Sequence, residues 1–202
     1  GDAYINVHYA FMPKDGLRPG QKKLPWAGRA FKSVDELINT AAWLQRLSDT
    51  RDMWVCLTSQ REAQPTTSKT GHPYNKAVRL AENAVAVKSL WLDLDVEAGN
   101  PKKYDTLEAA AEGLAKFYVD SRMPGASVIV QSGGGLHVYW TFDRVLTPQE
   151  WYPLACALTA AGDKHGLKFD HITTNAARVL RLPGTLYFKT DALSPWCLVV
   201  RT

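Results

Sequence analysis

The chain has 202 residues, of which 46% are hydrophobic and 22% are charged, and its net charge is +4. This composition is typical of a globular protein and excludes disordered, collagen-like and coiled-coil chains. No apolar run is long enough to span a membrane, and the first residues lack the pattern of a signal peptide. The three cysteines are far apart and form no C-x-x-C pair, which argues against disulfide and cysteine-zinc frameworks. We therefore expect a cytoplasmic protein without a membrane partner.

The surplus of positive charge lies at the two ends of the chain. Residues 1–80 hold 12 Lys and Arg against 7 Asp and Glu, and residues 164–202 hold 6 against 2. The central segment, 81–163, holds 6 against 11. A basic frame around an acidic centre suits a protein that holds a polyanion beside metal-binding carboxylates, but it is also common in proteins that bind no nucleic acid.

Local patterns predict alternating helices and strands without an internal repeat. A capping box at Ser33 and Glu36 marks one helix start, and Pro148 marks another. In chain order we expect a short apolar segment (4–11), a basic loop rich in Pro and Gly (12–29), a helix after Ser33, a strand (53–57), a polar loop (58–75), a helix from about Asn75, a strand-forming run (85–96), a helix from Thr106 that breaks at Pro124, a hairpin (127–142), a helix (147–164) and short strands and turns. These elements predict one compact α+β unit whose N-terminal lobe ends near residue 84.

The strand-forming run contains two aspartates that are two residues apart, Asp93 and Asp95. Alternate residues of a strand share a face, so both carboxylates project to one side while Leu92 and Leu94 enter a core. Two close carboxylates repel each other unless a cation lies between them, and hard oxygen ligands suit Mg²⁺ or Mn²⁺. A solvated edge strand is the alternative, because D-x-D tripeptides also arise by chance.

The hairpin turn contains Ser132, three glycines and His137. With Gly134 and Gly135 as the central turn residues, Ser132 pairs with His137 and both side chains emerge on one face. Such a pair can hold a phosphate or sugar oxygen, and the glycines let a ligand approach the backbone. A permissive turn with a surface histidine is the competing interpretation.

A third group contains Asp170, which we expect at the end of a strand after Leu167 and Phe169, and the cations Arg178, Arg181 and Lys189. Arg forks and Lys charges both bind phosphates. A basic turn with Asp170 in a salt bridge would also explain these residues. Taken together, the three groups predict metal-assisted nucleotidyl transfer, in which three aspartates hold two divalent ions beside a nucleoside triphosphate.

The combination resembles the archaeo-eukaryotic primase superfamily, and within it the primase-polymerases of mobile elements, phages and CRISPR loci. The segment 91–95 resembles the D-x-D motif of that family, 132–137 resembles its Ser-to-His motif, and Asp170 resembles its third acid. The run Arg178–Thr185 with Lys189 resembles an R-x-x-R-x-P-G-T-x-x-x-K segment of the primase-polymerase branch. These blocks cover about half of the chain, residues 91–189.

The resemblance implies a catalytic core in which an N-terminal α/β lobe (1–84) packs on an RRM-like antiparallel-sheet module (85–202), with the active site in the cleft between them. It implies Asp93, Asp95 and Asp170 as metal ligands for Mg²⁺ or Mn²⁺. Ser132 and His137 would contact the phosphates and sugar of the incoming nucleotide, while Arg178, Arg181 and Lys189 would bind its triphosphate. The implied partners are a single-stranded DNA template with its primer, NTP or dNTP, and fused or associated helicase, priming or CRISPR domains.

Aromatic side chains offer stacking surfaces for single-stranded bases, and the basic loop from Lys14 to Arg29 offers contacts to the DNA backbone. The candidates are Trp26, Trp43, Trp54, Tyr74, Trp91, Tyr139 and Trp140. Packing explains most tryptophans in a protein of this size, so we expect no more than one or two to act as base platforms.

The sequence thus predicts a template-directed DNA primase or polymerase. Two other functions use the same residues. A non-catalytic replication initiator or single-stranded-DNA-binding module would use the basic and aromatic surface, whereas a metal-dependent phosphodiesterase would use the carboxylates to release nucleotides.

Overall fold

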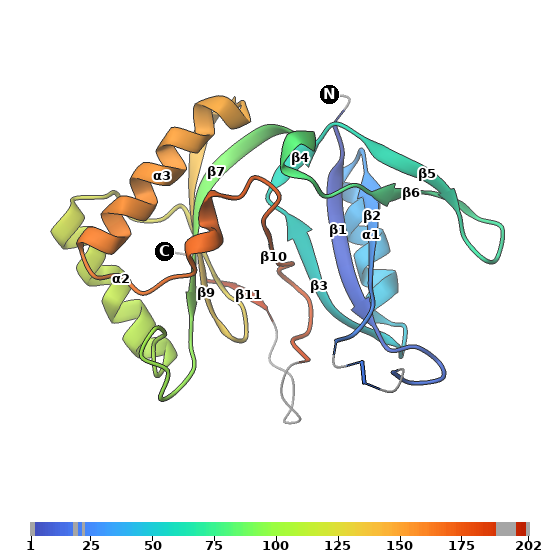
Figure 1. Ribbon diagram of the computed structural model, residues 1–202, viewed down its shortest axis with the longest axis horizontal. Coiled ribbons are helices and arrows are strands. Elements are labelled where there is room, and N and C mark those ends of the chain that lie inside the picture. Colours follow the sequence, from blue (N-terminus) through green and yellow to red (C-terminus); the bar gives the residue numbers. More distant parts are fainter. Residues whose placement is uncertain (1–2, 18–19, 22, 189–196, 201–202) are drawn as a thin grey trace.

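The computed structural model describes residues 3–17, 20–21, 23–188 and 197–200, which form two antiparallel sheets and three α-helices (Figure 1). The first sheet contains, in spatial order, β10 (Val179–Arg181), β3 (Thr50–Cys56), β1 (Ile5–Phe11), β2 (Trp26–Phe31), β6 (Pro73–Ala77) and β5 (Ala63–Thr67). The second contains β11 (Leu198–Val200), β8 (Val128–Gln131), β9 (Gly135–Leu146), β7 (Ala84–Asp95) and β4 (Thr58–Gln60). The helices are α1 (Val34–Gln45), α2 (Leu107–Ser121) and α3 (Pro148–Lys164), with 3₁₀ turns η1 (Ala81–Asn83) and η2 (His171–Thr174).

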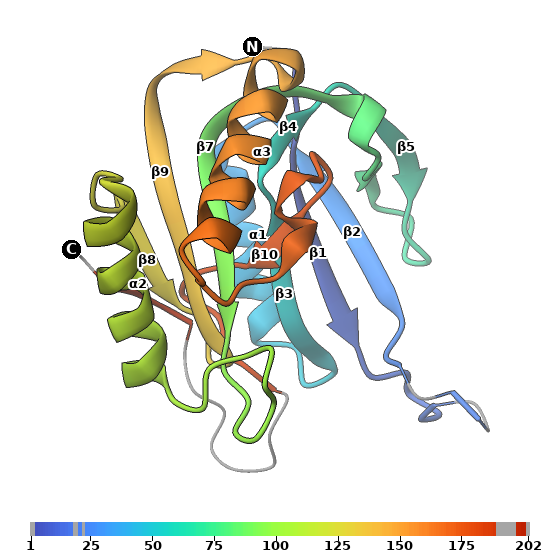
Figure 2. The same cartoon turned by 60° about the vertical axis from the view of Figure 1, so that its left-hand side comes forward.

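The helices begin at the residues that their capping signals predict. Ser33 accepts hydrogen bonds from the backbone of Asp35 and Glu36, and Thr147 forms a reciprocal capping box with Glu150. α1 packs on β3, β1 and β2 of the first sheet. In Figure 2, α2 and α3 lie together in front of the second sheet, where they pack against β9 and β7. No helix in the described part of the chain is long and apolar enough to cross a membrane.

Three strands of the second sheet, β7, β8 and β9, have the order of the corresponding strands of an RRM. The chain runs β7, α2, β8, β9, α3, and β9 pairs with both β7 and β8, so it lies between them. This confirms the predicted α+β class with an antiparallel sheet. β4 joins this sheet from the N-terminal part of the chain, and β10 joins the first sheet from the C-terminal part. The division into domains 1–84 and 85–202 remains a prediction.

Two local predictions are wrong. The polar segment 58–75 forms β4, β5 and part of β6 rather than a loop, and the helix expected from Asn75 is absent, because Asn75 pairs with Pro65 in a hairpin. β5 and β6 lie at the edge of the first sheet and are largely solvent-exposed. A strand exposed on both faces needs no alternation of polar and apolar residues, so its sequence resembles a loop.

A buried histidine makes the stability of the first sheet depend on pH. His8 pairs with Trp54 on β3 and Gly28 on β2, and its Nε2 atom has no hydrogen-bond partner among the described residues. Burial, and secondarily the charge of Arg79, lower the pKa of His8 to about 4. The folded state therefore keeps His8 neutral, whereas the unfolded chain binds a proton as the pH falls below about 6.5.

We expect this difference to lower the free energy of unfolding by about 2 kcal/mol between pH 7 and pH 5. Denaturant titrations at both pH values measure it. In His8→Gln, the drop in the free energy of unfolding between pH 7 and pH 5 should be smaller by about 2 kcal/mol, whatever the stability of the variant at pH 7. His72→Gln, at an exposed histidine between β5 and β6, is the control. An unchanged pH dependence in His8→Gln would contradict the prediction.

Candidate active site

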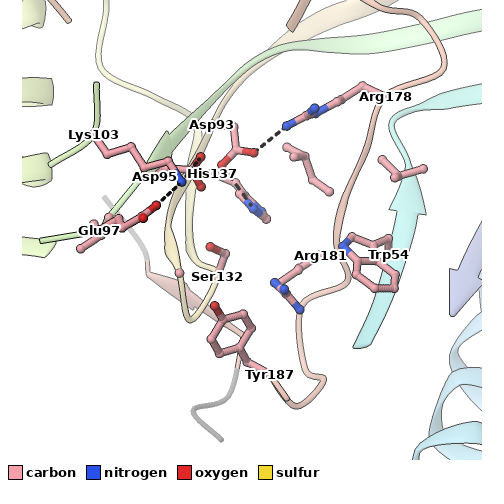
Figure 3. Close-up of a pocket in the computed structure, with 14 residues that line it drawn as sticks. Trp54, Asp93, Asp95, Glu97, Lys103, Ser132, His137, Arg178, Arg181 and Tyr187 are labelled. Atoms are coloured by element: carbon pink, nitrogen blue, oxygen red, sulfur yellow. Dashed lines mark hydrogen bonds and ion pairs between the residues drawn. The ribbon is translucent and has the colours of Figure 1, made fainter. Parts of the chain in front are cut away.

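A cavity of about 560 Å³ lies where the two sheets meet (Figure 3). β7 and the β8–β9 turn supply one wall, and β3, β10 and the segments next to β10 supply the other. Its lining residues are Trp54, Asp93, Asp95, Val96, Glu97, Lys103, Ser132, Gly134, His137, Arg178, Val179, Leu180, Arg181 and Tyr187. Six of the eight residues singled out in the sequence therefore line one cavity between the sheets.

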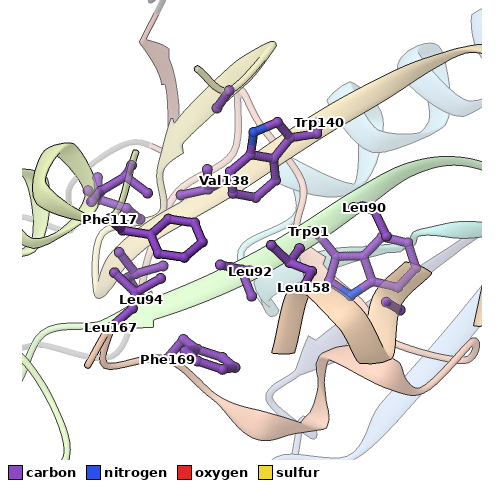
Figure 4. Packing of buried hydrophobic residues seen from close by; sticks show 14 of the residues in the cluster. Leu90, Trp91, Leu92, Leu94, Phe117, Val138, Trp140, Leu158, Leu167 and Phe169 are labelled. Carbon is purple, nitrogen blue, oxygen red and sulfur yellow. The ribbon is translucent and has the colours of Figure 1, made fainter. Parts of the chain in front are cut away.

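Asp93 and Asp95 line this cavity from β7, as the alternation of the strand predicts. On the opposite face Leu92 and Leu94 are fully buried in the core beneath α2 and α3 (Figure 4). Burial raises the pKa of the Asp93 carboxyl, although the Arg178 guanidinium opposes this shift. Burial and the neighbouring Asp93 charge raise the pKa of Asp95, against the effect of Lys103. The fold thus holds two carboxylates where ionisation is unfavourable without a nearby cation.

The glycine turn differs from the predicted register. Ser132 donates its backbone N–H to the carbonyl of Gly135, so Gly133 and Gly134 are the central residues, and His137 pairs with Val130. Gly133 has φ of 82°, which suits the first central position of a tight hairpin turn. The partner of Ser132 has moved by two residues. A shift of two preserves the face, so Ser132 and His137 still line the same cavity.

His137 is buried on β9 and pairs with Asp93 across the sheet. Its Nε2 lies 3.8 Å from Asp93 Oδ1, and its Nδ1 has no hydrogen-bond partner among the described residues. Burial lowers the pKa of His137 to about 3, with further contributions from Arg181 and Arg178. The imidazole is therefore neutral at physiological pH and can donate one hydrogen bond to a ligand.

Asp170 does not end a strand as expected. It caps η2, where its side chain accepts the N–H of Ile172, because a short acceptor at that position satisfies a free backbone donor. Its own N–H donates to the carbonyl of Asp93 at 2.8 Å, which fixes this distant segment against β7. Asp170 lines an adjoining cavity of about 550 Å³, and Asp95 lines both cavities.

Arg178 joins two of the three predicted acids. Its Nη2 lies 2.7 Å from both Asp93 Oδ2 and Asp170 Oδ2, and all three side chains are largely buried. Among the described residues, no three His, Cys, Asp or Glu side chains are grouped closely enough to hold a metal ion as they stand. Carboxylate oxygens are donors that a hard divalent cation prefers, and here they converge from two segments of the chain. The Arg178 guanidinium lies between Asp93 and Asp170, so a cation bound to both would replace these ion pairs.

Arg181 lines the cavity from β10 and contacts three side chains, of which the sequence indicated Trp54 but not Asp52 or Tyr187. It forms an ion pair with Asp52, and its guanidinium lies 4.1 Å from the Tyr187 ring centre and 5.5 Å from that of Trp54. Lys103, also unpredicted, lies 3.5 Å from Asp95. Lys189 lies outside the described residues.

The aromatic candidates divide between core and surface. Trp91 and Trp140 are buried, and Trp91 stacks on Trp151 of α3. Trp26 and Trp43 are about half exposed. Trp54 is the candidate that lines the cavity, on the wall opposite the aspartates.

Protein-family models and curated protein sequences give no match to this chain. Among solved structures, the AEP domain of the primase-polymerase of cyanophage S-2L is similar, with a TM-score of 0.58 and 15% identity over 97% of this chain and 80% of that chain. The polymerase domain of Mycobacterium tuberculosis ligase D, solved with DNA, gives a TM-score of 0.47 and 12% identity over 99% of this chain and 74% of that chain. The two sheets, their connections and the first of these similarities give one conclusion: the chain has the fold of the AEP domain of that primase-polymerase.

Proposed function

We propose that the protein is a template-directed nucleotidyltransferase, a DNA primase or polymerase that adds nucleotides from NTP or dNTP to a 3′-hydroxyl. One observation carries the proposal: acids from two distant segments, Asp93 and Asp170, converge on Arg178 at the edge of a cavity that Ser132 and His137 also line. Carboxylates beside phosphate-binding groups are what nucleotidyl transfer requires. The fold shared with the cyanophage primase-polymerase domain supports this choice.

Asp93, Asp95 and Asp170 would hold two divalent ions, Mg²⁺ or Mn²⁺, which supply charge neutralisation of the triphosphate and a lower pKa for the attacking hydroxyl. Arg181 faces the cavity with its guanidinium fixed by Asp52 and Tyr187, so it can bind a phosphate with little loss of side-chain freedom. Ser132 and His137 offer neutral hydrogen bonds on the acidic wall, where they can orient phosphate and sugar oxygens. The protein's own contribution is therefore positioning and charge.

A primer-extension assay tests the proposed activity. The purified chain is incubated with an end-labelled primer on a longer template strand, with all four dNTPs or NTPs, in Mg²⁺ or Mn²⁺. We expect longer products that disappear in EDTA. Shortened primer would instead indicate the phosphodiesterase, and template binding without any metal-dependent product would indicate the binding module.

His137→Ala should impair use of the incoming nucleotide far more than template binding. A hydrogen bond to a charged phosphate contributes about 1.5–3 kcal/mol, so we expect KM for the nucleotide to rise by about 10- to 100-fold. Steady-state extension kinetics measure KM, and anisotropy of a labelled template strand measures binding. An equal loss of both would contradict the assigned role. His165→Ala, at a histidine at the end of α3, is the control.

A further inference from the structure

An aromatic pair covers part of the first sheet on the face turned away from α1. Met53 packs beneath α1, so its neighbour Trp54 projects to the other side, toward the cavity. There Trp54 stacks on Trp26 of β2, with ring centres 4.4 Å apart and planes 18° apart. Trp26 nevertheless remains 49% exposed. The Trp26 indole is thus fixed parallel to Trp54 while about half of its surface remains exposed to solvent.

The pair is the outer end of a longer stack that crosses the cavity. Beyond Trp54 come the Arg181 guanidinium and then the ring of Tyr187. Tyr187 lies so close to the glycine turn that a Cβ added at Gly133 would overlap its ring and one added at Gly134 would press on it. Figure 3 shows Trp54, Arg181 and Tyr187 in this order along the cavity. The stack therefore connects the exposed Trp26 with the residues that surround the proposed nucleotide site.

The surroundings of Trp26 favour an anionic strand as its ligand. The Arg79 guanidinium lies 5.9 Å from the Trp26 ring centre, and His8 lies beside the ring at 6.2 Å between centres. Residues 1–80 as a whole carry 12 basic against 7 acidic side chains. An exposed flat ring with a cation beside it matches a nucleic-acid base and its phosphate, since bases stack on aromatic side chains and phosphates pair with Arg.

We infer that Trp26, supported by Trp54, is a stacking platform for a base of a single-stranded nucleic acid that enters the cavity along the first sheet. That this strand is the template rests on the proposed function. Binding to the platform requires neither divalent ions nor the three aspartates. It can therefore be measured separately from catalysis.

The test is fluorescence anisotropy of a labelled oligo(dT) strand in EDTA, with the full chain. Stacking of one base contributes about 1–3 kcal/mol, so Trp26→Ala should bind about 5- to 100-fold more weakly. Trp26→Phe should keep most of the affinity, because it keeps a stacking face. Trp43→Ala is the matched control, since Trp43 is 51% exposed and also lies near an arginine, Arg29, but sits on α1. It should bind as the unmodified chain does.

A strand of the same length that carries abasic sites separates stacking from charge. The unmodified chain should prefer the strand with bases, and Trp26→Ala should lose that preference while its affinity for the abasic strand stays the same. No preference in the unmodified chain, or equal losses in Trp26→Ala and Trp43→Ala, would overturn the inference. If the unmodified chain extends primers but Trp26→Ala binds the oligo(dT) strand as well as the unmodified chain does, the proposed function holds and the platform is wrong. If Trp26→Ala loses binding but the unmodified chain extends no primer, the platform holds and the proposed function is wrong.

Discussion

Asp93→Asn is expected to reduce nucleotide incorporation by about 100- to 1000-fold while the protein stays folded. The substitution keeps the shape of the side chain but removes one charge from the acids that would bind the divalent ions, and a group placed at the reacting charge is typically worth this much. Burial disfavours the ionised Asp93 carboxylate, so removal of its charge stabilises the fold. This effect opposes the stability lost with the Asp93–Arg178 ion pair. We therefore expect Tm to shift by only a few degrees.

Single-turnover primer extension and thermal melts measure the two quantities. Asp143→Asn is the matched control, because Asp143 lies on β9 of the same sheet and is exposed. Asp170→Asn should resemble Asp93→Asn in activity. Incorporation at the normal rate by Asp93→Asn would remove the metal-binding role from this residue, and a large drop in Tm would show that its role is structural.

Gly135→Ala is expected to cost about 3 kcal/mol or more of stability and to disrupt the site as well. Gly135 pairs with Asp95 and has φ of 156°, a conformation that residues with a Cβ rarely adopt. A Cβ there would overlap the carbonyl oxygen of Leu94 and lie 3.0 Å from the Cα of Asp95. Because backbone atoms cannot rotate away, β7 must move, and Asp95 must move with it.

Denaturant unfolding measures the stability change, and Gly125→Ala is the control. Gly125 has open space around the position of a Cβ and no left-handed φ, so its replacement should change stability by less than about 1 kcal/mol. Similar unfolding curves for the two variants would contradict the close approach of β9 to β7 at Gly135.

The sequence predicted features that local chemistry determines and missed those that depend on tertiary contacts. The cap at Ser33 and the helix start at Pro148 depend on residues within one helical turn, so their positions follow from the neighbouring sequence. The shared face of Asp93 and Asp95 follows from strand geometry alone. The exact pairing of Ser132 did not follow, because three consecutive glycines allow the turn to form at more than one position.

The contacts that surround Arg181 illustrate the second group. Asp52 is 129 residues away in the chain, and an isolated aspartate in a strand carries no signal of its partner. The capping role of Asp170 was likewise hidden, since the alternation of Leu167 and Phe169 resembles a strand even though both residues are buried next to a 3₁₀ turn. The motif resemblance assigned Asp170 and Arg181 to one site, but their contacts and geometry depend on the folded chain.

The exchange of β4 and β10 between the sheets ties the two halves of the polypeptide together. Each sheet would lose an edge strand if the chain were cut near residue 84, so neither fragment holds all the hydrogen-bonding partners that its sheet requires. The same crossing places Arg181 on one sheet and Asp93 on the other. Any change in the angle between the sheets would therefore change the distance between the Arg181 cation and the Asp93 acid.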